Sequence, residues 1–244
     1  MGNINIIQNG ALPDAGSLGV LWSVAVEEQF YLAVPFILII LPTKLYPWVF
    51  CGVIVFSILF RMLYLNNDLM LEMHTFAFVG NLATGGLIAY FSISSQRFVS
   101  FFEELGLRFI VILYLSIIAI FFFRTEIFSN WLLNILSSSI IASLFAIVIL
   151  EQTYSKNSIF KMRNNRVFSY LGKYTYGLYC LHLIAAIFVL QITAYLHINT
   201  QLWQVIFLES PLMLLISILM AYITYRFYEK PFLRLKDRFS FQRL

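Results

Sequence analysis

Charged side chains are scarce in this chain, and their scarcity excludes an ordinary soluble protein. Asp, Glu, Lys and Arg make up 11% of the 244 residues, whereas hydrophobic residues make up 61%. Soluble globular domains carry about 25% charged residues, so the composition predicts an integral membrane protein. The net charge of +4 does not indicate nucleic-acid binding, because the basic residues are distributed as membrane topology requires.

Cysteine and histidine are also rare, and neither forms a metal-binding motif. Cys51 and Cys180 both fall in apolar segments, where we expect two buried thiols rather than a disulfide scaffold. His74, His182 and His197 are scattered along the chain. The sequence contains no HExxH, P-loop or GxGxxG pattern, so we expect no metal and no nucleotide-binding loop of those kinds.

Long apolar segments fill most of the chain. Seven of them have the length of about 20 residues that a transmembrane helix needs, which predicts an all-α, polytopic membrane helix bundle. No flexible linker or low-complexity stretch separates them, so residues 1–244 are expected to form a single transmembrane domain. The seven segments are residues 18–41, 46–64, 74–91, 107–123, 131–150, 170–195 and 203–225.

Lysine and arginine fall on one side of this arrangement. All of them except Arg61 and Arg124 lie in alternate gaps or at the C-terminal end, and such residues are retained in the cytoplasm. The C-terminus is therefore expected to be cytoplasmic and, with seven spans, the N-terminus external. Residues 1–17 would form an external loop. Residues 226–244 would form a basic cytoplasmic tail that either contacts anionic lipids or attracts an anionic cosubstrate.

The most informative stretch is residues 22–31, WSVAVEEQFY, because it places two acids inside the first apolar segment. Glu27 and Glu28 would lie about 15 Å from the start of that helix, near mid-membrane. A carboxylate there costs about 2.5–3.5 kcal/mol on insertion scales and usually faces a bundle interior or a wet cavity. We expect at least one of them to be catalytic. The alternative is a neutral, hydrogen-bonded acid that only ties helices together.

Helical spacing assigns neighbours to these two acids. Trp22 and Gln29 share one face, and Glu28 and Tyr31 share another. Glu27 and Glu28 are about 100° apart, so we expect one to face a cavity and the other to pair locally. Trp22, Gln29 and Tyr31 are the substrate-binding candidates of this segment.

A second informative stretch covers residues 170–182. Tyr176, Tyr179 and His182 recur every three residues and form a polar stripe, which Lys173 extends toward the cytoplasmic side. Hydroxyls ending in an imidazole can bind a polar ligand or relay a proton, so His182 is a catalytic candidate and Lys173, Tyr176 and Tyr179 are binding candidates. The alternative is an aromatic stripe packed in the bundle, with His182 hydrogen-bonded to a neighbour.

Two further stretches predict structure more than chemistry. Residues 78–86 are rich in small side chains, which predicts close helix packing with Asn81 as a polar tie. Glu209 lies just before Pro211 in the last apolar segment. This acid either lines a cavity or hydrogen-bonds to backbone that the proline disrupts.

Three of these stretches together resemble the acyltransferase 3 family, membrane O-acyltransferases that modify cell-surface sugars. They are residues 22–31, residues 172–182 (GKYTYGLYCLH) and Glu229-Lys230-Pro231, and the likeness covers residues 10–238. The resemblance implies a protein of the bacterial cytoplasmic (inner) membrane. It would move an acyl group, most simply acetyl, from acyl-CoA to a hydroxyl of a surface glycan or lipid-linked sugar. It also implies an intramembrane site that includes Glu27 or Glu28 and the stripe ending at His182.

The resemblance also implies missing parts. Family members have ten spans, and the first three, with the histidine of an Arg/Lys-x10-His motif, have no counterpart among the seven segments. A missing N-terminal segment or a second chain would then supply the rest. Two alternatives stay open: a seven-span carrier or receptor that binds a small ligand without chemistry, and an inactive truncated remnant.

Overall fold

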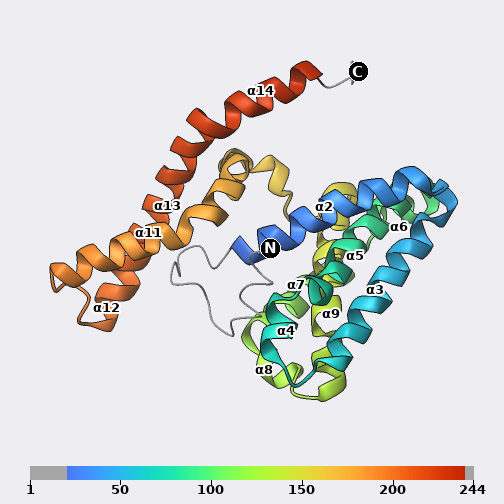
Figure 1. The fold of residues 1–244 in the computed structure, drawn as a ribbon, viewed down its shortest axis with the longest axis horizontal. Coiled ribbons are helices and arrows are strands. Elements are labelled where there is room, and N and C mark those ends of the chain that lie inside the picture. Colours follow the sequence, from blue (N-terminus) through green and yellow to red (C-terminus); the bar gives the residue numbers. More distant parts are fainter. Residues whose placement is uncertain (1–20, 240–244) are drawn as a thin grey trace. The chain divides into compact units, whose positions relative to one another are not determined.

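The computed structural model describes residues 21–239, and every regular element within that range is helical. The described part of the chain divides into two compact units. The first is Trp22–Lys161, and the second begins at Met162. The expected external loop, residues 1–17, lies outside the described residues. Figure 1 shows the order of the elements along the chain.

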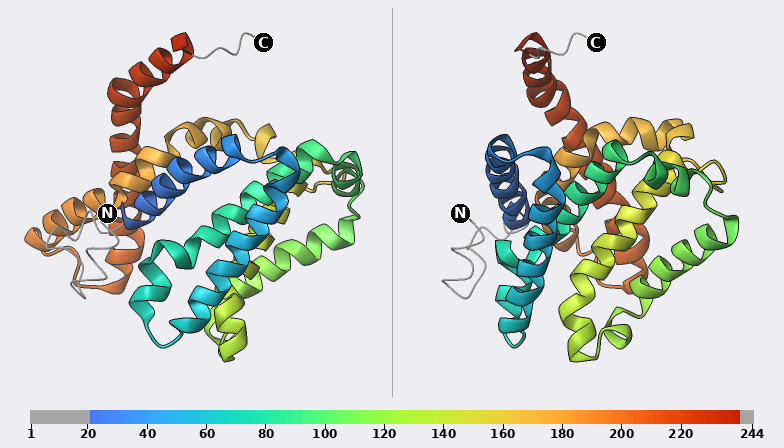
Figure 2. Two further views of the ribbon diagram at one scale, coloured as in Figure 1. Left: turned by 45° about the vertical axis from the view of Figure 1, so that its right-hand side comes forward. Right: turned by 90° about the vertical axis from the view of Figure 1, so that its right-hand side faces the viewer.

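In the first unit, α3 (Tyr46–Leu63), α5 (Thr75–Ser94) and α9 (Trp131–Tyr154) pack against one another (Figure 2). Its elements are α2 (Trp22–Ile40), η2 (Thr43–Leu45), α3 (Tyr46–Leu63), α4 (Asp68–Met73), α5 (Thr75–Ser94), α6 (Gln96–Glu103), α7 (Leu107–Phe122), α8 (Arg124–Ile127) and α9 (Trp131–Tyr154).

Small side chains let α3 and α5 approach closely, as the sequence predicted. A Cβ built on Gly80 would lie 2.7 Å from Ser57 Cβ, so only glycine fits there. One turn away the Ser57 hydroxyl donates to the Ala77 carbonyl at 3.1 Å. Asn81 exchanges hydrogen bonds with Ser138 of α9 at 2.8 and 3.0 Å. Its predicted role as a polar tie is confirmed.

Side-chain caps fix where several of these helices begin. In each case a side-chain acceptor takes up a backbone N–H of the first turn, which has no partner inside the helix. The imidazole of His74 does this for α5 and also stacks on Phe60, with ring centroids 4.7 Å apart. The capping residues are Asn67 for α4, His74 for α5, Ser95 for α6 and Asn130 for α9.

Helices α6 and α7 meet at a sharp angle of 87°. Phe102 and Leu105 at this corner pack with Ile110 of α7 and Leu150 of α9 in a buried apolar cluster. Six helices of the described residues are long and apolar enough to span a membrane, and the bent α6–α7 pair makes a seventh if it counts as one span.

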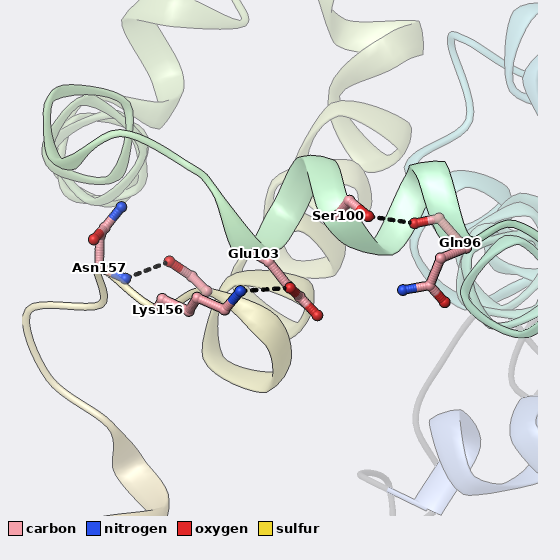
Figure 3. A network of polar contacts seen from close by, with 6 residues as sticks. Gln96, Ser100, Glu103, Lys156 and Asn157 are labelled. Carbon is pink, nitrogen blue, oxygen red and sulfur yellow. Dashed lines mark hydrogen bonds and ion pairs between the residues drawn. The ribbon is translucent and has the colours of Figure 1, made fainter.

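The segment after α9 is tied back to this corner by the polar network in Figure 3. Lys156 donates to Glu103 through its ammonium at 2.8 Å and through its backbone N–H at 3.0 Å. Asn157 donates to the Leu105 carbonyl at 3.0 Å. The hydrogen bond and negative charge of Glu103 raise the pKa of the Lys156 ammonium. The end of α9 is therefore anchored to α6.

The second unit is built on the pairing of α11 with α13. Two π-helical stretches, each ending in a glutamate, flank α13. Tyr174 is buried beneath the rings of Tyr170, Tyr222 and Tyr225. The elements are η3 (Met162–Asn164), α10 (Arg166–Leu171), η4 (Gly172–Tyr174), α11 (Thr175–Tyr195), α12 (Leu202–Gln204), η5 (Val205–Glu209), α13 (Ser210–Thr224), η6 (Tyr225–Glu229) and α14 (Lys230–Phe239).

Two expectations from the sequence are corrected here. Cys51 is exposed on α3, not buried, because it lies on a face of α3 that the other described helices do not cover; Cys180 is half-buried. Glu209 is buried, and its carboxylate accepts a hydrogen bond from the Thr193 hydroxyl of α11, a partner that neither role expected from the sequence included. Pro211 lies in the first turn of α13, where proline is tolerated.

Candidate functional site

Helix α2 packs on α5 through one stripe of side chains. The Trp22 ring lies 5.1 Å from the Phe78 ring, centroid to centroid. Val26 is buried, and Gln29 accepts a hydrogen bond from the Thr75 hydroxyl at 2.7 Å. Trp22 and Gln29 therefore face α5 together, as helical spacing predicted.

Glu27 and Glu28 lie off this stripe, and both side chains are exposed. Glu27 borders a cavity of about 190 Å³ that is also lined by Ser23 and Asn81. Glu28 and Tyr31 face away from the other described elements of this unit. Glu27 thus agrees with the expectation that one acid faces a cavity. Among residues 21–239 neither carboxylate has a hydrogen bond or ion pair, so the local pairing expected for the other acid is not found there. The reason is that α2 packs chiefly against one helix and so covers one face.

The stripe on α11 is present, and its imidazole has a defined orientation. The His182 Nδ1 lies 2.6 Å from the carbonyl oxygen of Tyr179. Because a carbonyl only accepts hydrogen bonds, Nδ1 carries a proton, and in the corresponding neutral tautomer the lone pair on Nε2 is the acceptor. The rings of Tyr179 and His182 lie 5.8 Å apart. Tyr176 and Tyr179 are exposed.

Lys173 lies in η4, just before this helix. Its ammonium sits 5.9 Å from the centroid of the Tyr170 ring, a distance at which a cation is attracted to an aromatic face. Both side chains are exposed. The stripe residues lie in the second unit and the α2 acids in the first, so the two groups of candidates are described separately.

The second unit also joins two stretches that sequence reasoning treated apart. The Glu229 carboxylate of η6 lies beside Gly177 of α11, where a Cβ would come within 3.1 Å of Oε1. Tyr176 and Glu229 line a cavity of about 350 Å³ together with Tyr228 and Phe232. From the sequence, Glu229-Lys230-Pro231 is noted only as part of the family resemblance. The available signal was Gly177 inside an otherwise bulky helix, which marks close approach of another group.

Arg61 is a polar residue that sequence reasoning counted only for topology. It is 6% exposed in the last turn of α3. Its Nε donates to the Ile135 carbonyl at 2.9 Å, and Nη1 donates to the Leu71 carbonyl at 3.3 Å. Nη2 donates to the Asn134 carbonyl at 3.3 Å and the Ser137 hydroxyl at 3.4 Å. The signal was an arginine inside an apolar segment, which marks a polar interior.

Glu151 is a second missed residue, fully buried near the end of α9. Its Oε2 accepts hydrogen bonds from the Tyr114 hydroxyl at 3.0 Å and from Gln152 Nε2 at 2.8 Å. Its Oε1 has no partner among the described residues. Lys161 donates to the carbonyls of Glu151 and Gln152 at 3.0 and 2.8 Å, which satisfies the last turn of the helix.

Within residues 21–239 no group of three or more His, Cys, Asp or Glu side chains is placed to hold a metal ion. The polar candidates instead consist of carboxylates, hydroxyls and an oriented imidazole. Such groups can bind hydroxylated ligands and move protons.

Comparison with known proteins identifies one family. The model of the acyltransferase 3 family, described as an acyltransferase domain, matches residues 2–226. No curated protein and no solved structure matches the chain.

Proposed function

Because this chain belongs to the acyltransferase 3 family, we propose that it is a membrane enzyme that transfers an acyl group, most simply acetyl, from acyl-CoA to a hydroxyl of a cell-surface glycan or lipid-linked sugar. The family match over residues 2–226 is the observation that carries this proposal. The long apolar helices of the described residues agree with a membrane enzyme.

In this reaction the acceptor oxygen attacks the thioester carbonyl. The carbon–sulfur bond breaks, an ester carbon–oxygen bond forms, the hydroxyl proton passes to a base, and the CoA thiolate leaves and takes up a proton. His182 suits the role of base, because its Nδ1 is committed to the Tyr179 carbonyl and its Nε2 can accept a proton. Glu28 suits the role of a carboxylate that orients a basic or hydroxyl group, because no described residue occupies its oxygens.

The acyl donor is proposed to arrive from the cytoplasm. CoA carries several phosphate charges, and basic residues crowd the segment between α9 and α11: Lys156, Lys161, Arg163, Arg166 and Lys173. Charges of one sign raise the local concentration of an oppositely charged substrate.

The test is acyl transfer by the full chain in lipid vesicles, with radiolabelled acetyl-CoA and membranes that supply the glycan acceptor. His182→Gln is expected to lower the rate about 100-fold or more, as loss of a general base does. Glu28→Gln is expected to lower it about tenfold or more by misplacing the reacting group.

Two matched variants serve as controls: His197→Gln, in the segment after α11, and Glu126→Gln, in the exposed helix α8. Both should retain the parent rate. A Glu28→Gln enzyme of unchanged rate removes Glu28 from the mechanism. An absence of transfer by the parent chain with every acceptor would contradict the proposed function as a whole and favour an inactive remnant.

A further inference from the structure

A long groove runs along α9 in the first unit. Its main cavity has a volume of about 660 Å³ and is polar at one end, where it is lined by Arg61, Asp68, Glu72, Arg124 and Asn134. These residues come from the end of α3, from α4, from α8 and from the start of α9. Four elements thus bring charged and amide groups to one end of the bundle.

The rest of the groove is mostly apolar, with Asn81, Ser137 and Ser138 as its polar residues. Ile141, Ala142, Phe145 and Ile149 of α9 line it, with Leu82 on α5. From Asn134 to Ile149 a helix rises about 22 Å, which is most of the hydrocarbon thickness of a bilayer. A further cavity of about 320 Å³ shares residues Ala146 and Ile149 with it and continues to Tyr154.

At the polar end Arg61 has no ion-pair partner among the described residues, although Asp68 and Glu72 line the same cavity. Arg61 is buried, yet its hydrogen bonds go to neutral carbonyl and hydroxyl oxygens. The described residues make a single ion pair, between Lys156 and Glu103. Neither Asp68 nor Glu72 therefore forms an ion pair with Arg61 or Arg124. A buried charge without an ion-pair partner is costly. After its four hydrogen bonds Arg61 keeps one N–H for a ligand, and the exposed guanidinium of Arg124 at the same cavity can bind a phosphate through two N–H groups.

We propose that this groove binds a lipid-linked sugar, in which a phosphate joins a sugar to a long apolar chain. Arg61 and Arg124 hold the phosphate, and the chain lies along α9. Asp68 and Glu72 accept hydrogen bonds from the sugar hydroxyls, and the Asn134 amide can both accept from and donate to them. The inference rests on the proposed function, because the bound sugar would supply the hydroxyl that is acylated. The length of the groove favours a membrane-borne ligand over a free sugar phosphate.

Binding to the full chain in nanodiscs is measured without acyl-CoA, using three probes. The first is a hexose phosphate esterified to a polyprenyl chain, the second is the same hexose phosphate without the chain, and the third is the polyprenyl hexoside without phosphate. We expect the first probe to bind at least tenfold more tightly than either of the others. Equal affinity for the first two would assign the site to a soluble sugar phosphate and overturn the proposal, as would equal affinity for the first and third.

Variants locate the binding in the groove. Arg124→Gln is expected to weaken the phosphate-bearing lipid probe about tenfold (about 1.4 kcal/mol) and to leave the phosphate-free probe unchanged. Ala142→Trp is expected to weaken both lipid probes about tenfold by filling the apolar part. Arg108→Gln and Ser143→Trp, exposed positions on α7 and α9 that do not line the groove, are the matched controls.

Arg61→Lys keeps the charge but cannot reach four oxygens with a planar fork. It is expected to weaken the phosphate probes, and its unfolding temperature in detergent is measured alongside to separate binding from misfolding. Unchanged affinity in both Arg124→Gln and a folded Arg61→Lys would overturn the proposal. Tight binding of the lipid probe without acyl transfer would support the groove as a lipid-linked sugar site and contradict the proposed acyltransferase function. Acyl transfer to a lipid-free glycan without binding of the lipid probe would support the proposed function and overturn the groove site.

Discussion

At the residue scale, Arg61 holds together elements that are distant in the sequence. Its guanidinium reaches oxygens on Leu71 before α5 and on Asn134, Ile135 and Ser137 of α9. The buried guanidinium thus joins the end of α3 to α4 and to the first turn of α9. Arg61 therefore has a structural role in addition to the ligand-binding role proposed for it in the groove.

Replacing Arg61 by alanine is expected to destabilise the protein by about 2–3 kcal/mol or more, because hydrogen bonds from a charged donor contribute about 1.5–3 kcal/mol each. The measurement is the unfolding midpoint in mixed detergent–SDS micelles. Arg124→Ala is the control, because the Arg124 side chain is exposed and such changes stay within about 0.5 kcal/mol. Equal midpoints for the two variants would show that Arg61 adds nothing to stability.

Thr193 and Glu209 form a buried pair between α11 and η5. The Thr193 hydroxyl donates to the Glu209 carboxylate, and both side chains are at most 1% exposed. Thr193→Val is expected to destabilise by about 1–3 kcal/mol, since it leaves a buried acceptor unpaired. Combining it with Glu209→Leu should cost less than the sum of the two changes, as coupled partners do. Strict additivity in the same unfolding assay would contradict the pairing.

The residues that were placed correctly from the sequence are those whose position follows from helical spacing or from the small residues around them. Trp22 and Gln29 share the face that meets α5, and Asn81 bonds to α9. The local pairing expected for one of Glu27 and Glu28 is not found, because spacing gives the angle between residues but not which face a neighbour covers. Arg61 was missed because counting basic residues by gap treats each arginine as a loop residue.

At the scale of elements, the close contact of α3 and α5 depends on glycine. Gly80→Ala would place a Cβ 2.7 Å from Ser57 Cβ and 2.9 Å from its Oγ, so the helices must separate. We expect a loss of about 1–3 kcal/mol, as for other overpacked positions. Gly85→Ala on the same helix is the control, because nothing lies within 4 Å of its Cβ; alanine there should be neutral or slightly stabilising. A harmless Gly80→Ala would contradict the packing.

The anchor between α6 and the segment after α9 should weaken in alkali. The hydrogen bond and charge of Glu103 raise the pKa of Lys156, so the ammonium form stabilises the folded anchor. This stabilisation is complete below the pKa of an ordinary lysine and is lost as pH rises through the raised value. The protection of the amides of residues 155–158 against hydrogen exchange, relative to the intrinsic exchange rate at each pH, should therefore fall across that range. Lys156→Gln should remove this transition. A transition that persists in the variant would assign it to another group.

The elements themselves were largely predictable. Each of the seven apolar segments contains a long described helix, because the length of an apolar run dictates a span. The short helices α4 and α8 and the π-helical stretches η5 and η6 were not predicted. Their form depends on local hydrogen bonds, such as that from Ser210 to the Val205 carbonyl at 3.0 Å, which periodicity does not encode.

At the scale of the whole molecule, the first unit bears on whether α7 crosses the membrane. Arg61 ends α3 and Arg124 follows α7, and both line the same cavity. From the end of the unit where Arg61 lies, the chain leaves through α5, and it returns to that end through α7. Helix α7 therefore runs back across the same layer that α5 crosses. Its 16 residues span about 24 Å, slightly less than the hydrocarbon core. This geometry favours seven spans over six.

Labelling of single cysteines with a membrane-impermeant maleimide distinguishes these topologies, after Cys51 and Cys180 are replaced by alanine. With seven spans, Asn66→Cys before α4 and Asn164→Cys between α9 and α11 lie on opposite sides of the membrane. The distribution of basic residues predicts that Asn164 is cytoplasmic, so in intact cells only Asn66→Cys should react, and both should react after permeabilisation. If α6 and α7 instead enter and leave on one side, the number of crossings between the two positions is even, and both cysteines react from the same side. That result would put Arg124 and Arg61 on opposite sides and would contradict the seven-span topology together with the shared polar end of the groove.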